Sequence, residues 1–163
     1  MVRTALIRGV FAVGVATAAV FAGTGTAFAD QNAVYATLLN GKSGKCLSIS
    51  GGGSTGNNAA AIQYTCNGGD EQYWAFDSAG LLNLKSGKCL SVAGGGSTAN
   101  GAAAIQYTCN GSAEQSWVLY NSGELLNVKS GKCLSLDNGG STANGTAAII
   151  WTCNGGAEQR WAW

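Results

Sequence analysis

The chain repeats a unit of about 44 residues three times. The first cysteine of each unit recurs at intervals of 43 and 44 residues, and a second cysteine follows each first one by 20. Each unit closes with Gln-x-Trp, and residues 85–117 and 129–161 differ at only eight of 33 positions. The closing motifs are Gln72-Tyr73-Trp74, Gln115-Ser116-Trp117 and Gln159-Arg160-Trp161. A fixed period of this length indicates one supersecondary unit used three times, so a site built within a unit is also built up to three times.

Residues 1–29 have the composition of a secretory signal peptide. Arg3 and Arg8 are followed by an apolar stretch of small residues, and Ala27-Phe28-Ala29 offers small side chains at the cleavage position. We therefore expect a secreted mature domain of residues 30–163. A membrane anchor is the alternative, but it needs about 20 strongly apolar residues, and this stretch is diluted by Gly, Ala and Thr. We expect no membrane span after cleavage.

The charge of the expected mature domain is low. Of nine basic residues Arg3 and Arg8 fall in the leader, which leaves seven against eight acidic residues and a net charge of −1. Nucleic-acid-binding proteins usually present a basic field, so we expect no nucleic acid partner. The chain contains no His, which excludes His-dependent triads and His metal ligands. We expect neither a metal ion nor a cofactor.

The six cysteines of an exported chain indicate disulfides. Six cysteines allow fifteen pairings, but the threefold repeat favours the one that every unit can satisfy alone. That pairing is Cys46 with Cys66, Cys89 with Cys109, and Cys133 with Cys153. A zinc site is the alternative, but the sequence has neither His nor a CxxC spacing.

Short apolar segments alternate with turn sequences throughout each unit. The strands expected in the second unit are residues 81–84, 89–92, 104–107 and 117–120. Four strands per unit give about twelve in an all-β chain, and no helical period is long enough to compete. The one-residue difference between the repeat intervals falls in the turn at 120–124, where a hairpin tip tolerates insertion. The units are placed at about residues 36–77, 78–121 and 122–163.

Together, the Cys-Leu start, the partner cysteine and the closing Gln-x-Trp of all three units resemble the ricin B-chain-type β-trefoil lectin family. The resemblance covers essentially the whole expected mature chain. It implies a β-trefoil with pseudo-threefold symmetry, whereas three blades are too few for a propeller. It also implies that the final strand pairs near the first, at residues 35–40. Residues expected in the core are Leu47, Leu90, Leu134, Trp74, Trp117, Trp161 and Trp163.

Catalysis is hard to assemble from these residues. Glu71, Glu114 and Glu158 occur once per unit, so a threefold fold separates them by tens of ångströms, whereas paired-carboxylate glycosidases need roughly 5 to 10 Å. Asp70 and Glu71 are adjacent, but neighbouring side chains point apart. We expect no enzyme.

Sugar binding requires an exposed aromatic face with a few polar groups beside it. In related lectins this aromatic lies two residues before the second cysteine of the unit. The matching residues here are Tyr64, Tyr107 and Trp151. The alternative is that they are core aromatics, because a strand side chain can point to either face.

Three positions of each unit depart from the family pattern. The Asp usually found two residues after the first cysteine is replaced by Ser48, Ser91 and Ser135. The polar residue often found four before the second cysteine is replaced by Ile62, Ile105 and Ile149, and the Asn before the motif Gln by Glu71, Glu114 and Glu158. A neutral Ser forms weaker hydrogen bonds than a carboxylate, so we expect weak binding or a changed sugar. We hypothesise that the Glu supplies the lost carboxylate from the opposite wall, with the Ser and the motif Gln (Gln72, Gln115 or Gln159) completing the site.

The third unit is the best candidate for an active sugar site. It has Trp151 as its stacking face and the extra polar pair Asp137-Asn138, which could instead be a plain turn. The hairpin at 141–145 is expected to form one rim.

The sequence therefore predicts a secreted, non-catalytic carbohydrate-binding protein. The resemblance implies galactose- or xylose-containing glycans or polysaccharides as partners, and three weak sites can raise avidity by roughly 10² to 10⁴. The alternative is a degenerate trefoil that works through protein contact, as an inhibitor-like or surface interaction module. We expect a monomer.

Overall fold

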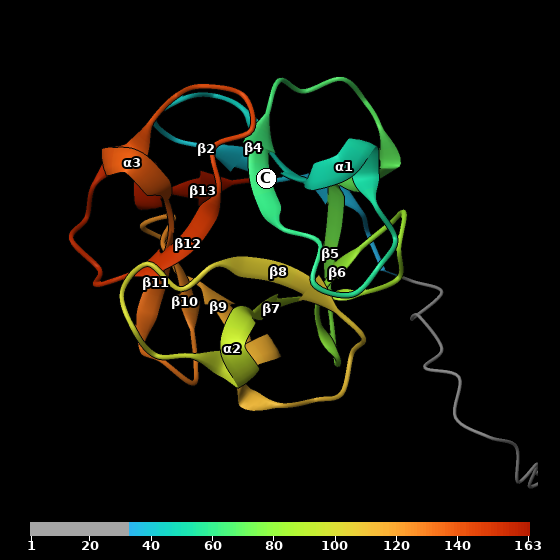
Figure 1. The fold of residues 1–163 in the computed structure, drawn as a ribbon. Coiled ribbons are helices and arrows are strands. Elements are labelled where there is room, and N and C mark those ends of the chain that lie inside the picture. The colour runs from blue at the N-terminus through green and yellow to red at the C-terminus, as the bar shows by residue number, and fades with distance from the viewer. Residues whose placement is uncertain (1–32) are drawn as a thin grey trace, which may run out of the picture.

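The computed structural model describes residues 33–163, and the expected signal peptide lies outside these residues. Three units of similar shape surround a common centre, with the turns α1, α2 and α3 spaced around it (Figure 1). The first unit contains β1 (Ala36–Thr37), β2 (Leu39–Asn40), β3 (Cys46–Ile49), α1 (Ser50–Gly53), β4 (Ala61–Tyr64), the 3-10 turn η1 (Asp70–Gln72) and β5 (Tyr73–Asp77). The second contains β6 (Gly80–Asn83), β7 (Cys89–Val92), α2 (Ala93–Gly96), β8 (Ala104–Tyr107), η2 (Ala113–Gln115) and β9 (Trp117–Leu119). The third contains β10 (Leu125–Asn127), β11 (Lys132–Leu136), α3 (Asp137–Gly140), β12 (Ala148–Trp151), η3 (Ala157–Gln159) and β13 (Trp161–Ala162).

All strand pairs in residues 33–163 are antiparallel, and the last strand pairs with a strand of the first unit. The sheets have the orders β1-β5-β6-β7-β8, β12-β11-β10-β9 and β13-β2-β3-β4. Strand β13 pairs with β2, with Trp161 opposite Asn40, which confirms the expected contact of the last strand with residues 35–40. The expected first strand is divided at Leu38: β1 pairs with β5 and β2 with β13. A first strand shared between two sheets joins the first and third units, as a closed trefoil requires.

The expected core is confirmed for six of its seven residues. Leu47, Leu90 and Leu134 are fully buried, and each accepts a hydrogen bond at its carbonyl oxygen from a motif tryptophan. The indole nitrogens of Trp74, Trp117 and Trp161 donate these bonds at 3.0, 2.9 and 3.0 Å. Since a buried indole N–H needs a partner, one motif residue of each unit is anchored to the backbone of the same unit.

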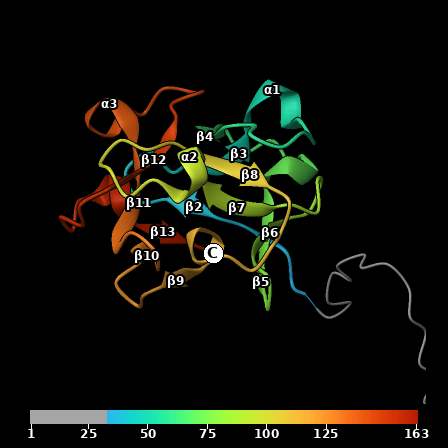
Figure 2. The ribbon, with the colours of Figure 1, turned by 60° about the horizontal axis from the view of Figure 1, so that its bottom comes forward.

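Trp163 is not in the core, contrary to the sequence expectation. Its side chain is 46% exposed and meets Phe76 edge-on with ring centroids 5.9 Å apart. Figure 2 shows the chain end on the side opposite α1 and α3, beyond the last residue of β13. Strand β13 has only two residues, so Trp163 extends past the last strand pair and lies at an open end of the barrel.

The three disulfides join the cysteines within each unit, as the repeat predicted. They link Cys46 to Cys66, Cys89 to Cys109 and Cys133 to Cys153, with Cα atoms 5.1 to 5.2 Å apart. Each bond connects the start of a central strand to the loop after its hairpin partner. The loop that carries the Gln-x-Trp motif is thereby held against the β-hairpin.

The elements α1, α2 and α3 are single tight turns, not regular helices. Gly51 and Gly52 have φ of 66°, and in the third unit Asn138 takes the left-handed conformation with φ of 53°. Asn tolerates this region because its short polar side chain can hydrogen-bond locally. In the described part of the chain, no helix is long and apolar enough to cross a membrane.

Candidate carbohydrate-binding sites

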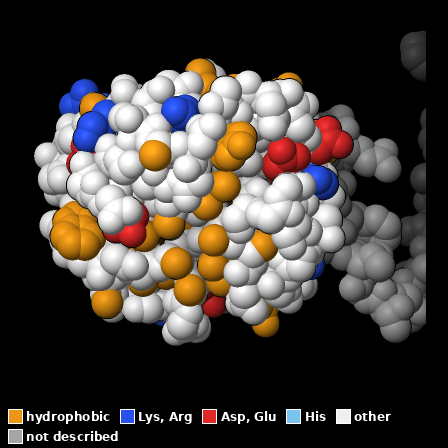
Figure 3. Space-filling model, turned by 45° about the horizontal axis from the view of Figure 1, so that its top comes forward, with side chains coloured by type: hydrophobic (Ala, Val, Ile, Leu, Met, Phe, Trp, Pro, Cys, Tyr) orange, Lys and Arg blue, Asp and Glu red, His pale blue; other side chains and the backbone are white. Residues whose placement is uncertain are grey.

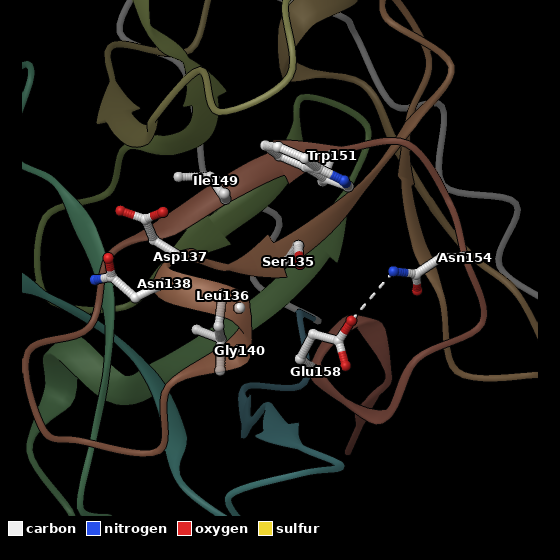
Figure 4. Close-up of a pocket in the computed structure, with 10 residues that line it drawn as sticks. Ser135, Leu136, Asp137, Asn138, Gly140, Ile149, Trp151, Asn154 and Glu158 are labelled. Atoms are coloured by element: carbon white, nitrogen blue, oxygen red, sulfur yellow. Dashed lines mark hydrogen bonds between the residues drawn. The ribbon is translucent and has the colours of Figure 1, made fainter.

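One pocket opens in each unit, between the turn that follows the central strand and the loop before the Gln-x-Trp motif. The pockets of the first, second and third units have volumes of about 280, 400 and 300 Å³. The unit-3 pocket, drawn in Figure 4, is lined by Ser135, Leu136, Asp137, Asn138, Gly139, Gly140, Ile149, Trp151, Asn154 and Glu158. The unit-1 pocket uses the equivalent positions, and the unit-2 pocket uses nine of them together with Asn58 of the first unit, so the repeat builds a similar hollow three times.

Strand register creates the floor and one wall of the unit-3 pocket. Ser135 on β11 lies directly opposite Ile149 on β12, and Cys133 lies opposite Trp151. Residues two apart on a strand share a face, so Ile149 and Trp151 project to the same side, beside Ser135. The same register places Ser48 opposite Ile62 and Ser91 opposite Ile105.

The floor serines are buried, but their hydroxyls remain available to a ligand. Ser48, Ser91 and Ser135 are 3 to 4% exposed and line their pockets. Within residues 33–163 these hydroxyls have no hydrogen-bond partner, and each retains contact with the hollow above it.

The candidate stacking aromatics lie at the pocket rims. Tyr64, Tyr107 and Trp151 are 42, 38 and 43% exposed and line the unit-1, unit-2 and unit-3 pockets. The alternative that they are core residues is therefore wrong. Figure 4 shows the indole of Trp151 on one side of Ser135 and Glu158 on the other.

The glutamates and the motif glutamines have different roles in the structure. Glu71, Glu114 and Glu158 line the pockets from η1, η2 and η3. Gln159 is fully buried and lies outside the lining: its oxygen accepts from the Asn154 backbone N–H at 2.8 Å, and its amide donates to the Thr152 carbonyl at 3.0 Å.

Gln72 and Gln115 repeat this arrangement in the other two units. The hypothesis that the motif Gln completes the sugar site is wrong in geometry, because both ends of the amide already bind backbone groups. The Gln instead shapes the loop that carries the pocket asparagine.

That asparagine is a site residue that the sequence reasoning missed. Asn67, Asn110 and Asn154 line the three pockets, and the Asn154 side-chain amide donates to Glu158 at 3.3 Å. The available signal was the Cys-Asn-Gly sequence in every unit, which turn propensity alone had explained. The side-chain oxygen of each asparagine accepts from the backbone N–H two residues on, so the group that it adds to the pocket is its amide donor.

Lysines from a neighbouring unit fix the glycine-rich turns behind the pockets. Lys42, Lys85 and Lys129 donate to the carbonyl oxygens of Gly139, Gly52 and Gly95 at 3.1, 2.9 and 2.8 Å. Lys85 also pairs with Glu71 at 3.7 Å, and Lys129 with Glu114 at 3.5 Å. Glu158 forms no such pair within residues 33–163, so its carboxylate is available to a ligand.

The pKa of Glu114 lies below its ordinary value. A hydrogen bond from the Ser112 side chain is the main cause, and the charge of Lys129 acts in the same direction. Charged side chains otherwise lie at the margins of the face shown in Figure 3, whereas apolar side chains gather toward its centre. The acidic residues that line the pockets are Glu71, Glu114, Glu158 and, in the third unit alone, Asp137.

Asp137 and Asn138 form a turn and also line the unit-3 pocket. They are the first two residues of α3 and line the unit-3 pocket, where Figure 4 shows them on the side away from Asn154. The hairpin at 141–145 does not line this pocket. It packs on the first unit, where the Gln63 side-chain amide donates to the carbonyls of Ser141 and Ala143 at 2.6 and 2.9 Å.

The described residues contain no group of three or more acidic or cysteine side chains that could hold a metal ion. The pockets offer hydrogen-bonding groups and an aromatic face instead. In chemical terms, such a combination binds a polar molecule that has one apolar face.

Comparison with known proteins identifies the family. The ricin-type beta-trefoil lectin domain matches residues 34–161. ThreeFoil, a designed 3-fold symmetric protein, is 37% identical with a TM-score of 0.72, over 78% of this chain and 95% of its own.

Two natural proteins have similar structures. The exo-beta-1,3-galactanase 1,3Gal43A from Clostridium thermocellum is 32% identical with a TM-score of 0.69, over 81% of this chain and 30% of its own. The agglutinin from Abrus precatorius is 21% identical with a TM-score of 0.70, over 83% of this chain and 49% of its own. No curated protein sequence matches. The extent of the family match and the shared trefoil show that the chain belongs to the ricin-type beta-trefoil lectin domain family.

Proposed function

We propose that this chain is a secreted, non-catalytic lectin that binds galactose- or xylose-containing glycans through three weak sites. The observation that carries this proposal is the composition of the pockets. Each combines an exposed aromatic, a serine hydroxyl at its floor, an asparagine amide and a glutamate. A pyranose presents a C–H face for stacking and hydroxyls around its edge, which matches this combination.

The choice of sugar rests on the family and on one relative. Galactose- and xylose-containing glycans are the class that the ricin-type resemblance implies. A galactanase contains a region 32% identical to this chain, which supports a galactose-rich ligand here. Because a floor Ser replaces the family Asp, we expect each site to be weak, with Glu158 supplying the charge-assisted hydrogen bond from the wall.

Secretion is supported by the leader and the disulfides. Residues 1–29 have the pattern of a signal peptide, and three disulfides favour an oxidising compartment. The protein acts as a monomer whose three pockets can engage one polysaccharide surface together.

A second candidate function is protein contact, and the open end of the barrel favours it. Phe76 and Trp163 form an exposed aromatic pair there, and Tyr120, which lines the same hollow as Trp163, is 49% exposed. Exposed aromatic residues are enriched where proteins meet. This end would then bind its partner independently of the pockets.

The deciding experiment is a glycan and polysaccharide array probed with the oxidised mature chain. Trp151→Ala removes the stacking face of the unit-3 pocket, and Trp163→Ala removes a similarly exposed tryptophan outside the three pockets as a matched control. Stacking on one aromatic contributes about 1 kcal/mol or more, so we expect Trp151→Ala to weaken binding at least fivefold and the control to leave it unchanged.

Absence of binding from the folded wild-type protein overturns the lectin proposal. Weakening by Trp163→Ala but not by Trp151→Ala would move the binding surface to the open end of the barrel.

A further inference from the structure

The three pockets provide an internal comparison, because most of their shared lining positions carry the same kind of residue. Three positions differ in more than aliphatic chain length. They are Asp137 against Ser50 and Ala93, Asn138 against Gly51 and Gly94, and Trp151 against Tyr64 and Tyr107. The unit-3 pocket therefore has its own chemistry on a scaffold that it shares with the other two.

The first difference is an additional carboxylate. Asp137 is exposed at the rim, and within residues 33–163 its carboxylate has neither a hydrogen bond nor an ion pair. The unit-1 and unit-2 pockets have one acidic residue each, Glu71 and Glu114. The unit-3 pocket thus has one more acidic side chain than either of the other two pockets.

The second difference is the state of the shared glutamate. Lys85 lies 3.7 Å from Glu71, and Lys129 lies 3.5 Å from Glu114. Within the part of the chain that the structure describes, the Glu158 carboxylate accepts a hydrogen bond only from the neutral side-chain amide of Asn154, at 3.3 Å. Lys42, the equivalent lysine, donates to the Gly139 carbonyl, as Lys85 and Lys129 do to Gly52 and Gly95, but it lies beyond ion-pair distance of Glu158. Its charge offsets one of the two carboxylates at most.

The third difference is the aromatic face. Indole is the best of the aromatic side chains at attracting a cation over its ring. Trp151 lines the same hollow as Asp137 and Glu158, and Figure 4 shows the three around Ser135. The added carboxylate, the unpaired glutamate and the indole all favour a positively charged ligand group.

We propose that the unit-3 pocket selects sugars that carry a free amino group, such as glucosamine or galactosamine residues, over neutral and N-acetylated sugars. This inference rests on the proposed lectin function and names the ligand class of one of its three sites. The ammonium group is attracted by Asp137, by Glu158 and by the face of Trp151. Acetylation of the nitrogen removes the charge and with it the preference.

The test is isothermal titration calorimetry of the mature chain with two hexasaccharides of equal length. One is β-1,4-linked glucosamine and the other its fully N-acetylated form, and lactose and xylohexaose serve as neutral family-type ligands. An exposed ion pair changes affinity by about two- to fivefold, so we expect the amine form to bind at least that much more tightly at low salt. The ratio should fall as salt rises.

Asp137→Ala gives the third unit the residue that the second unit has at this position, so the fold already accommodates it. We expect this variant to lose most of the preference for the amine form. Asp70→Asn removes the same charge from an exposed site outside the pockets and should keep the preference. This control separates local recognition from general attraction of a cationic sugar to the protein.

Equal affinity for the two hexasaccharides, or a preference that Asp137→Ala retains, overturns this inference. If lactose or xylohexaose still binds, the lectin proposal stands and only the preference for amino sugars is lost. If none of the four ligands binds to the folded protein, both proposals fail.

Discussion

At the scale of single residues, the three pocket glutamates are chemically distinct although they occupy equivalent positions. Two of them are within ion-pair distance of a lysine, and Glu158 is not. Surface ion pairs contribute little to stability, but they compete with a ligand for the carboxylate. The sequence alone could not distinguish the three, because each unit contains the same lysine and the same glutamate.

Glu158→Gln should therefore weaken glycan binding by the unit-3 pocket about fivefold. The change keeps the shape but replaces a charge-assisted hydrogen bond with a neutral one, a loss of about 1 kcal/mol. Calorimetry with a galactose- or xylose-containing oligosaccharide measures the effect, and Glu71→Gln is the matched control with a smaller expected loss. Unchanged affinity of Glu158→Gln would show that this carboxylate does not contact the sugar.

Glu114 should titrate below the ordinary glutamate range. The Ser112 side chain and Lys129 stabilise its charged form, so its folded-state pKa is lower than its unfolded-state pKa. This difference stabilises the fold at pH above the unfolded pKa, and the contribution is lost as pH falls through the folded pKa. Carboxyl NMR titration should show the pKa rising in Ser112→Gly, which introduces the residue found in the other units. A pKa that does not move would exclude the serine as the cause.

At the scale of elements, the glycine-rich turns α1, α2 and α3 set the position of the pocket glutamates. The last glycine of α3, Gly140, has φ of +74°, and a Cβ atom added there would lie 2.6 Å from the Glu158 Cβ. Its neighbour Gly139 has φ of +66° and open space around it. Two adjacent glycines thus differ in crowding but share the same backbone conformation.

Gly140→Ala should destabilise the protein more than Gly139→Ala and should also weaken unit-3 binding. Both substitutions place a side chain at positive φ, at about 1 kcal/mol or more, but only the first also displaces Glu158. Urea denaturation gives the free energies of unfolding, and calorimetry gives the affinities. Equal losses for the two variants would mean that crowding against Glu158 has no effect.

Element placement was the most predictable part of the fold. The strands expected at 89–92 and 104–107 coincide with β7 and β8, because β-branched and apolar residues there are bounded by Gly, Ser and Asn turns. The extra residue of the second repeat interval falls between β9 and β10, as expected of a hairpin tip. Local turn chemistry is encoded in neighbouring residues, so a sequence reading finds it.

Features that depend on distant contacts were less predictable. Gln159 was read as a sugar ligand, but its partners at Thr152 and Asn154 depend on how the loop folds. Trp163 was read as core from its position in the repeat, yet it lies past the two-residue strand β13 and is 46% exposed. A repeat predicts which residues are equivalent, but neighbours that break the symmetry decide their environments.

At the scale of the whole molecule, the three units are interlocked. The Gln106 side-chain amide donates to the carbonyls of Ser54 and Gly56 in the first unit at 2.6 and 2.8 Å, as Gln63 does toward the third. At the equivalent position of the third unit, the buried Ile150 replaces these polar contacts with apolar packing. One hydrophobic cluster contains residues of all three units, so no unit has a complete core of its own.

Removal of the Cys133–Cys153 disulfide by serine substitution should therefore destabilise the whole molecule. A loop of about 20 residues contributes about 3 kcal/mol in the chain-entropy model, and the other two disulfides close loops of the same length. We expect similar losses for each pair of substitutions, each with one cooperative unfolding transition, because the units share their core. Denaturation followed by both tryptophan fluorescence and circular dichroism measures the loss and tests the cooperativity. Two separate transitions in the third-unit variant would show that this unit unfolds independently. Avidity for a polysaccharide surface would then fall only by the contribution of the unit-3 pocket.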